Sequence, residues 1–146
     1  MSTKLEDLNP VVAAAATRAL AEMKEKGIDA VVTYTFRTDS EQRALYAQGR
    51  KPLDVVNIMR RSAGLYQLAE KENRYTVTNC DGEKKRSPHQ SGKAVDIVPV
   101  EKGRAVWPSL SDPRWRPIAE VMKKHGFIWG GDWKDFPDYP HYQMEA

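Results

Sequence analysis

The rest of the chain is arranged around the residues Ser87-Pro-His-Gln-Ser-Gly-Lys-Ala-Val-Asp96. His89 and Asp96 are seven residues apart, an odd offset, so their side chains would point to opposite faces of one unbroken strand. The chain must therefore bend between them. We place the bend at Gly92, because glycine reaches backbone conformations that other residues avoid. After the bend, the β-branched residues of 93–98 predict a strand.

Asp96 is the unusual residue of that strand. The alternation of a strand places Ala94, Asp96 and Val98 on one face, with Val95 and Ile97 on the other. A carboxylate among such apolar neighbours costs much free energy unless it is paired or bound to a metal. Asp96 therefore requires a partner from elsewhere in the chain.

The stretch Asp138-Tyr-Pro-His141 near the C-terminus offers that partner. Pro140 restricts the approach to His141, and 141–143 predict a short strand with His141 and Gln143 on one side. Prolines on both sides of Asp138 limit how far its loop can move. Two imidazoles and a carboxylate suit a catalytic zinc, which takes three protein ligands and leaves a fourth position for water.

A purely structural role for these histidines stays open on spacing alone, because the sequence has no His-Glu-x-x-His helix. The third histidine, His125, is assigned such a role, because it stands at the expected end of a helix, where a cation or a hydrogen-bond donor is favourable.

The order of predicted elements indicates the fold class. Asn9 and Pro10 suit the start of the first helix, and Thr38 with Glu41 forms a capping box that opens the second. Gly64 interrupts the third helical stretch, so two helices are possible there. We expect helices over 9–27, 38–48, 53–72 and 111–126, and strands over 30–36, 75–78, 93–98, 127–129 and 141–143. In the third helical stretch, Leu53, Val56, Ile58, Leu65 and Leu68 are expected to form the buried side. This order favours an α+β fold, with a small antiparallel sheet backed by helices.

A resemblance to a known family rests on four segments. They are Ser87-x-His89 with Gly92-x-Ala94-x-Asp96, Trp129-Gly-Gly-Asp-Trp133, Asp138-x-x-His141, and the arginine-bearing segment from Tyr34 to Arg50. Together they resemble the zinc peptidoglycan peptidases of the D-Ala-D-Ala carboxypeptidase and L-alanyl-D-glutamate endopeptidase family, which includes phage endolysins. The resemblance runs from about residue 30 to the end and implies a hedgehog/D-Ala-D-Ala peptidase-like fold in one zinc peptidase domain, 1–146.

The family assigns roles to residues of this chain. It implies that one catalytic Zn²⁺ is held by His89, Asp96 and His141. It also implies that Asp138 is the catalytic base, although some members have Glu there, and that Arg37 steadies the substrate carbonyl.

Arg37 stands at a predicted strand-to-helix junction, where two rigid elements can aim a side chain into a cleft. The alternative is a surface arginine that pairs with Asp39 or Glu41. Gln42 and Ser87 are candidates for substrate binding, although the Ser87 hydroxyl would equally suit a turn cap.

Three aromatic side chains, Trp107, Trp133 and Phe136, are placed either in the core or along a substrate groove. The basic cluster within 79–86 is expected to be a solvated turn, with glycan or peptide contact as the alternative.

Composition narrows the classes of function. The 146 residues suit one domain, and 40% hydrophobic and 29% charged residues describe a globular protein. The net charge of +3 is dispersed among 20 acidic residues, so we expect no nucleic-acid partner. A single Cys80 excludes an internal disulfide. No apolar run predicts membrane insertion and no leader pattern is seen, so we expect synthesis in the cytoplasm of the host bacterium. We also expect a monomer.

The expected activity follows from the resemblance. The substrate is the peptidoglycan stem peptide, and the expected reaction is zinc-dependent hydrolysis at L-alanyl-D-glutamate by a phage endolysin. Such an enzyme would reach the wall after release across the inner membrane and free progeny by host lysis. The alternatives are a D-Ala-D-Ala carboxypeptidase, a noncatalytic zinc-containing binding module and, with less support, a basic nucleic-acid-binding domain.

Overall fold

The computed structural model describes residues 1–145 and divides into two compact units. One unit, called here the sheet unit, comprises Ser2–Phe36 and the described residues from Ser91 to 145. The other, called the helical unit, comprises Met1 and Arg37–Gln90. Each unit has its own cluster of buried apolar side chains.

Five strands form the sheet of the sheet unit. They are β1 (Ala30–Tyr34), β2 (Ala94–Glu101), β3 (Arg104–Ala105), β4 (Ile128–Trp129) and β5 (His141–Gln143). The order is β1-β2-β5-β4, every pair is antiparallel, and β3 forms a hairpin with the end of β2. The central strand β2 therefore carries Asp96 between two neighbouring strands, as the sequence predicts for a residue that needs a partner.

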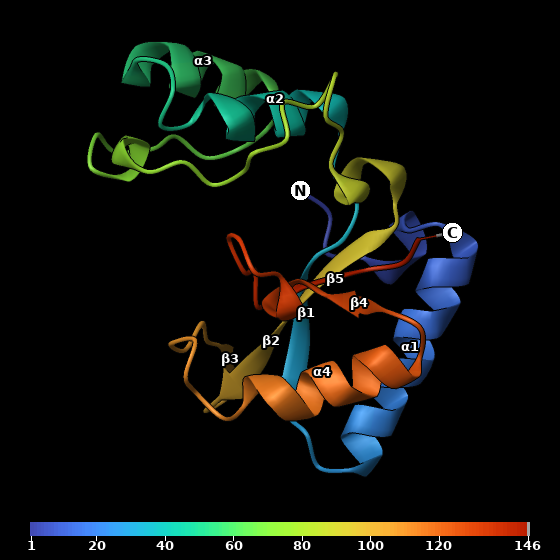
Figure 1. Cartoon of the computed structure of the whole chain (residues 1–146). Coiled ribbons are helices and arrows are strands. Elements are labelled where there is room, and N and C mark those ends of the chain that lie inside the picture. Colours follow the sequence, from blue (N-terminus) through green and yellow to red (C-terminus); the bar gives the residue numbers. More distant parts are fainter. Residues whose placement is uncertain (146) are drawn as a thin grey trace. The chain divides into compact units, whose positions relative to one another are not determined.

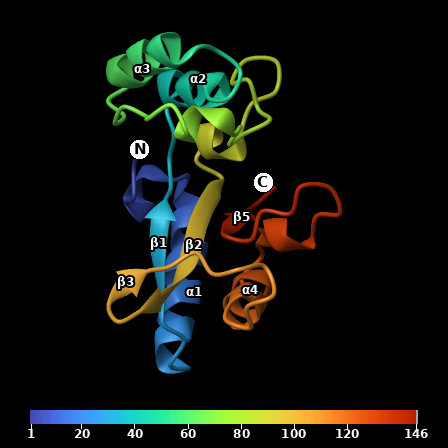
Figure 2. The same cartoon turned by 90° about the vertical axis from the view of Figure 1, so that its left-hand side faces the viewer.

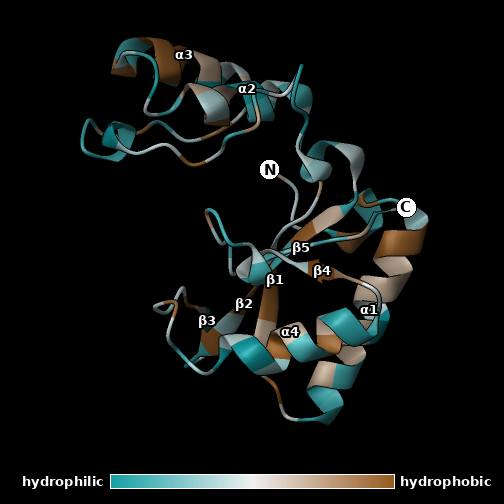
Figure 3. Ribbon diagram, viewed as in Figure 1, coloured by the Kyte–Doolittle hydropathy of each residue, from teal (hydrophilic) through white to brown (hydrophobic). Residues whose placement is uncertain are grey.

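Helices α1 (Pro10–Glu25) and α4 (Trp115–Lys124) pack with the sheet into one core. Figure 2 shows α1 behind β1 and β2. In Figure 3 both hydrophobic and hydrophilic residues lie along α1 and α4, as expected for helices with one buried face. The core side chains with the largest volumes include Trp115, Tyr142, Met23, Ile97 and Ile118.

The first helix begins and ends as predicted, because its signals are local. The side chain of Asn9 accepts a hydrogen bond from the Val11 amide, and Gly27 has a φ of +73° just past the helix end. The start of α4 is later than predicted. The Asp112 carboxylate accepts a hydrogen bond from the Arg114 amide, but this bond closes a turn. The helix begins only at Trp115.

The helical unit contains α2 (Asp39–Ala47), α3 (Leu53–Ser62) and short 3₁₀ turns at Glu72–Arg74 and Pro88–Ser91, the last of which ends at the boundary of the unit (Figure 1). The predicted capping box between Thr38 and Glu41 is present. Ala47, Val56 and Leu68 form the buried cluster of this unit.

Two predictions in the helical unit are wrong. The helix expected over 53–72 ends at Ser62, because Gly64 adopts a φ of +78° and the Leu65 amide turns back to the Arg60 carbonyl. Ile58, also expected on the buried side, is 58% exposed, because the buried face of α3 carries Val56 and Arg60 instead. The segment 75–78, expected to be a strand, has no strand partner within the described residues.

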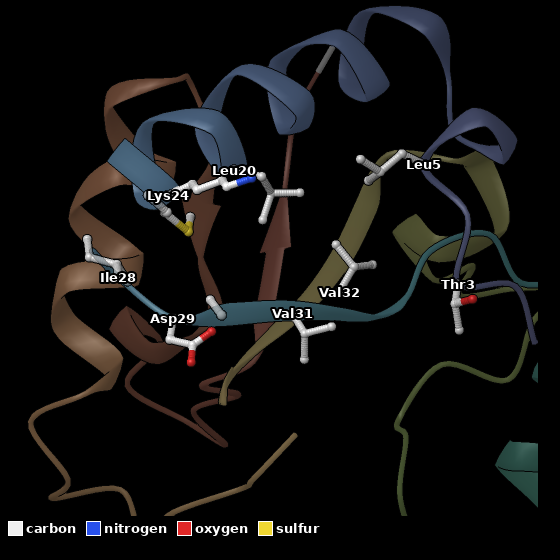
Figure 4. A pocket seen from close by; sticks show the side chains of 10 residues that line it. Thr3, Leu5, Leu20, Lys24, Ile28, Asp29, Val31 and Val32 are labelled. Carbon is white, nitrogen blue, oxygen red and sulfur yellow. The ribbon is translucent and has the colours of Figure 1, made fainter. Parts of the chain in front are cut away.

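A hollow of about 600 Å³ lies between α1 and β1 (Figure 4). Its lining is largely apolar, with Leu5, Leu20, Ile28 and Val32 among its residues. None of the predicted site residues lines this hollow. No helix within residues 1–145 has the length and apolar character needed to cross a membrane.

Candidate metal centre

Asp96 and His141 lie directly opposite each other on β2 and β5. The atoms Asp96 Oδ1 and His141 Nδ1 are 3.5 Å apart, and both side chains are largely buried. Pro140 fixes this register, because its carbonyl accepts the Ile97 amide at 2.9 Å. The structure thus brings together the carboxylate that needed a partner and the histidine proposed to provide one.

The bend before β2 is at Gly92, as predicted. Its φ is +69°, and a Cβ there would lie 2.9 Å from the backbone nitrogen of Asn9. The Asn9 amide also donates to the Gly92 carbonyl at 3.0 Å. The start of α1 therefore packs onto the bend, and only glycine satisfies both the dihedral angle and the close approach.

The surroundings of His141 favour a positive charge beside its ring. Burial by itself lowers the pKa of His141, but the hydrogen bond and charge of Asp96, the amide of Gln143 and the charge of Asp138 together raise that pKa above its ordinary value. A bound metal ion would supply such a positive charge in place of the proton.

Gln143 sets the tautomer of His141, a role that the sequence did not assign to it. Gln143 Oε1 lies 2.8 Å from His141 Nε2. A carbonyl oxygen can only accept, so Nε2 carries a hydrogen and Nδ1 is the atom that faces the Asp96 carboxylate. Either a proton on Nδ1 or a metal ion satisfies both of these atoms, and the arrangement fits a metal ligand held by an outer hydrogen bond. The two-residue spacing of a strand face was the available signal.

The loop before His141 is closed tightly around Gly130. The Gly130 carbonyl accepts the Asp138 amide at 2.9 Å, and the Asp138 carbonyl accepts the His141 amide at 3.2 Å. The Trp129 indole donates to the Tyr139 carbonyl at 2.7 Å. Asp138 itself is exposed, so a rigid backbone presents its carboxylate to solvent near His141. A Cβ at Gly130 would lie 2.4 Å from the Asp138 carbonyl oxygen, so the loop packs directly on this glycine.

The three aromatic side chains for which a core or groove position was considered are not core residues. Trp133 is 37% exposed and its ring lies 5.2 Å from the His141 ring, centroid to centroid. Phe136 and Trp107 are 80% and 59% exposed. Of these three, Trp133 is the one that the structure places against a predicted ligand.

The helical unit brings together four other predicted site residues. Arg37 lies between β1 and α2, as predicted, and its amide donates to the His89 carbonyl at 3.1 Å. Its Nη1 donates to Gln42 Oε1 at 2.8 Å. His89 is 3% exposed, and its amide donates to the Ser87 hydroxyl at 3.3 Å. Ser87 therefore caps this turn, which is the second of the two roles considered for it.

The two acids offered as surface partners of Arg37 have other contacts. Asp39 accepts hydrogen bonds from Gln90 and Arg86, which lower its pKa in that order of contribution. Glu41 binds the amino terminus at 2.8 Å and the Thr38 amide at 2.9 Å.

His125 has the structural role assigned to it, by way of a partner that the sequence did not suggest. It follows the last residue of α4, and its Nε2 lies 3.0 Å from Glu22 Oε1 on α1. Glu22 also binds Lys26 and Lys124. Hydrogen bonds from Lys26, His125 and Lys124 lower the pKa of Glu22 to about 2. This cluster joins the two helices, and none of the predicted ligands belongs to it.

Comparison with known proteins identifies relatives among peptidoglycan peptidases. A family model described as D-alanyl-D-alanine carboxypeptidase matches residues 81–144. The peptidoglycan L-alanyl-D-glutamate endopeptidase CwlK of Bacillus subtilis is 36% identical over 145 residues, covering 94% of this chain and 74% of that protein. The L-alanyl-D-glutamate peptidase of Listeria phage A118 is 40% identical over 60 residues, which are 40% of this chain and 21% of that protein.

Solved structures share the fold. The L-Ala D-Glu endopeptidase ChiX of Serratia marcescens has a TM-score of 0.60 at 21% identity, over 97% of this chain and 83% of that chain. The D,D-pentapeptidase VanY of a VanB-type resistance cassette, solved in complex with Zn(II), has a TM-score of 0.59 at 16% identity, over 95% of this chain and 73% of that chain. The predicted α+β class is confirmed.

The segments that suggested a family in the sequence lie within these matched regions. The Bacillus subtilis relative is similar over nearly the whole chain, and the family model covers residues 87–96 and 138–141, which contain the proposed ligands and Asp138. This chain therefore belongs to the D-alanyl-D-alanine carboxypeptidase family of peptidases, among whose members are L-alanyl-D-glutamate endopeptidases.

Proposed function

We propose that the protein is a zinc-dependent endopeptidase that hydrolyses the L-alanyl-D-glutamate bond of the peptidoglycan stem peptide. The observation that carries the chemistry is the pairing of Asp96 with His141 across β2 and β5, with Nδ1 facing the carboxylate. The choice of bond is supported by the relative in Bacillus subtilis, which is named for that cleavage.

His89 is proposed as the third ligand. It precedes Asp96 by seven residues, and the bend at Gly92 lies between them. Its imidazole, with that of His141 and the carboxylate of Asp96, makes the set of two nitrogens and one oxygen that catalytic zinc sites use. When bound, a single Zn²⁺ would supply a water whose pKa is about 7 and a positive charge beside the scissile carbonyl.

The chain's own residues would perform the remaining steps. Asp138 would take a proton from the attacking water and deliver it to the leaving amine, for which its exposed position at the end of a rigid loop is suitable. Arg37 would stabilise the negative charge that develops on the carbonyl oxygen. Gln143 would hold the hydrogen of the neutral His141 ring on Nε2, which leaves Nδ1 as the atom available to the metal.

Substrate binding by Ser87 stays a proposal. Its other role is that of a turn cap, in which the Ser87 hydroxyl accepts a hydrogen bond from the His89 amide. Trp133, packed against His141 and partly exposed, is proposed as a wall against which the peptide lies. The single catalytic domain 1–146 and the monomeric state stay predictions.

A D-Ala-D-Ala carboxypeptidase is the second candidate, and the description of the matching family model favours it. The two activities use the same zinc chemistry and differ in which bond of the stem peptide is cut. A noncatalytic zinc module is the third candidate, and the presence of Asp138 close to His141 argues against it.

The proposed biological role is that of a lysin which acts on the host wall. The similarity of 60 residues to a phage peptidase supports this role. Synthesis in the host cytoplasm and release across the inner membrane are the corresponding proposal for its route to the wall.

The deciding experiment is digestion of purified peptidoglycan with the zinc-loaded protein, with products identified by mass spectrometry and by labelling of new amino termini. The expected result is new D-Glu amino termini that are lost when the metal is chelated and return with added zinc. Release of free D-Ala would favour the carboxypeptidase instead. Intact peptidoglycan from several wall types would leave the noncatalytic module as the better assignment.

A further inference from the structure

Gln42 is a buried polar residue at the centre of the helical unit. It lies on α2, and its side chain is completely excluded from solvent, with an exposed fraction of 0%. A side chain without solvent access has no surface to offer a substrate. We propose that Gln42 is a positioning residue that holds the guanidinium of Arg37, and that it acts on catalysis only through Arg37. This inference rests on the role proposed above for Arg37.

The orientation of the Gln42 amide is determined by its partners. Nε2 lies 2.8 Å from the Cys80 carbonyl oxygen and 3.2 Å from Thr78 Oγ1. The Cys80 carbonyl can only accept, so the amide nitrogen must face it. Oε1 is thereby turned toward Arg37, whose Nη1 donates to it at 2.8 Å. A flipped amide would set two acceptors against each other at Cys80 and two donors at Arg37.

The backbone around Gln42 makes this orientation rigid. The Thr38–Glu41 capping box fixes the first turn of α2, from which Gln42 projects. A Cβ at Gly82 would lie 3.1 Å from Gln42 Cγ, so the loop packs closely on the side chain. The segment that was expected to form a strand at 75–78 instead supplies, with Cys80, the acceptors for this amide.

Hydrogen bonds thus hold both the backbone and the guanidinium of Arg37. Its amide binds the His89 carbonyl, and its guanidinium binds Gln42. A long side chain has many rotamers, and a partner of fixed orientation removes most of them before substrate binds. Because charge on the carbonyl oxygen develops only in the transition state, loss of this support should lower kcat and leave KM nearly unchanged.

The test is a double-mutant cycle of Gln42→Met and Arg37→Ala in the zinc-loaded protein, assayed on a soluble stem peptide. Gln42→Met keeps the length of the side chain and removes its hydrogen bonds. We expect kcat to fall about 10- to 100-fold, the range for a catalytic group displaced by about 1 Å. In the Arg37→Ala background the same change should alter kcat less than about twofold, because the residue through which it acts is gone.

Gln48→Met is the matched control. Gln48 follows the last residue of α2, is 7% exposed, and donates through Nε2 to the Glu72 carbonyl at 3.1 Å. This variant also removes a buried amide from the helical unit, so it should lower the melting temperature while kcat stays near the wild-type value.

Three outcomes are decisive. A loss from Gln42→Met that persists undiminished in Arg37→Ala would overturn the inference while leaving the proposed function intact. An unchanged rate in Arg37→Ala alone would remove Arg37 from the mechanism and the inference with it. If Gln42→Met does not fold, Thr78→Val takes its place. Thr78 Oγ1 accepts both Gln42 Nε2 and the Cys80 amide, so this change loosens both acceptors of Nε2 while it preserves shape. A kcat loss confined to proteins that retain Arg37 supports the inference, and no loss overturns it.

Discussion

Replacing Gly130 by alanine should disable the site, although no proposed ligand or catalytic residue is itself replaced. The added Cβ would lie 2.4 Å from the Asp138 carbonyl oxygen and 3.2 Å from the Cβ atoms of Asp138 and His141. Ordinary contact begins at 3.4 Å, so the Asp138 backbone must move by about 1 Å. The same carbonyl accepts the His141 amide, and the displacement therefore reaches the metal ligand as well.

The magnitude follows from these distances. Overpacking of a closed site costs about 1–3 kcal/mol of unfolding free energy. A shift of about 1 Å in a catalytic group costs on the order of 100-fold in rate. We therefore expect Gly130→Ala to lower kcat about 100-fold on a stem-peptide substrate, and to lower the melting temperature moderately.

The matched control is Gly103→Ala in the same unit. Gly103 has a φ of +78° and nothing within 4 Å of a built Cβ. Alanine there should cost about 1–2 kcal/mol from backbone conformation alone, with kcat unchanged. A Gly130→Ala protein that turns over at the wild-type rate would refute the claim that this loop positions Asp138 and His141.

Three further predictions concern single side chains. Asp138→Ala should keep a full equivalent of zinc by metal analysis yet lose hydrolysis, and retained turnover would exclude Asp138 as the base. Gln143→Leu should weaken zinc binding about 10- to 100-fold in a competition titration, because the His141 tautomer is no longer fixed; unchanged affinity would contradict this role. Glu22→Gln should lower the melting temperature at pH 7, whereas the exposed Glu25→Gln on the same helix should not. The pKa of Glu22 falls from 4.5 to about 2 on folding, so the stabilisation by its carboxylate is complete above pH 4.5. The difference in melting temperature between Glu22→Gln and wild type should therefore vanish as pH falls toward 2. A difference in melting temperature that stays constant through this range would argue against the ion cluster.

Local signals were sufficient wherever one residue and its immediate neighbours decide the conformation. Asn9 caps α1, the Thr38–Glu41 box opens α2, and Gly92 makes the bend before β2. The pairing of Asp96 with His141 was also predictable, because an isolated carboxylate in an apolar strand demands a partner and few candidates exist in the chain.

Segments whose conformation depends on distant partners were predicted less well. The propensities of 75–78 favour a strand, yet within residues 1–145 no strand pairs with this segment, and Thr78 instead receives a hydrogen bond from Gln42 on α2. The helix expected over 53–72 stops at Ser62, where Gly64 and a turn returning to Arg60 end it.

Residue identity and spacing were enough to predict the chemistry of the candidate site, because the donor types and the bend at Gly92 are local properties of the sequence. Only the tertiary structure decided how those groups are supported: the closure of the loop at Gly130, the amide of Gln143 on His141, and the amide of Gln42 on Arg37. Glycine and glutamine at such positions look ordinary in a sequence. Their roles arise from steric contact and hydrogen-bond direction between segments far apart in the chain, and those exist only once the chain has folded.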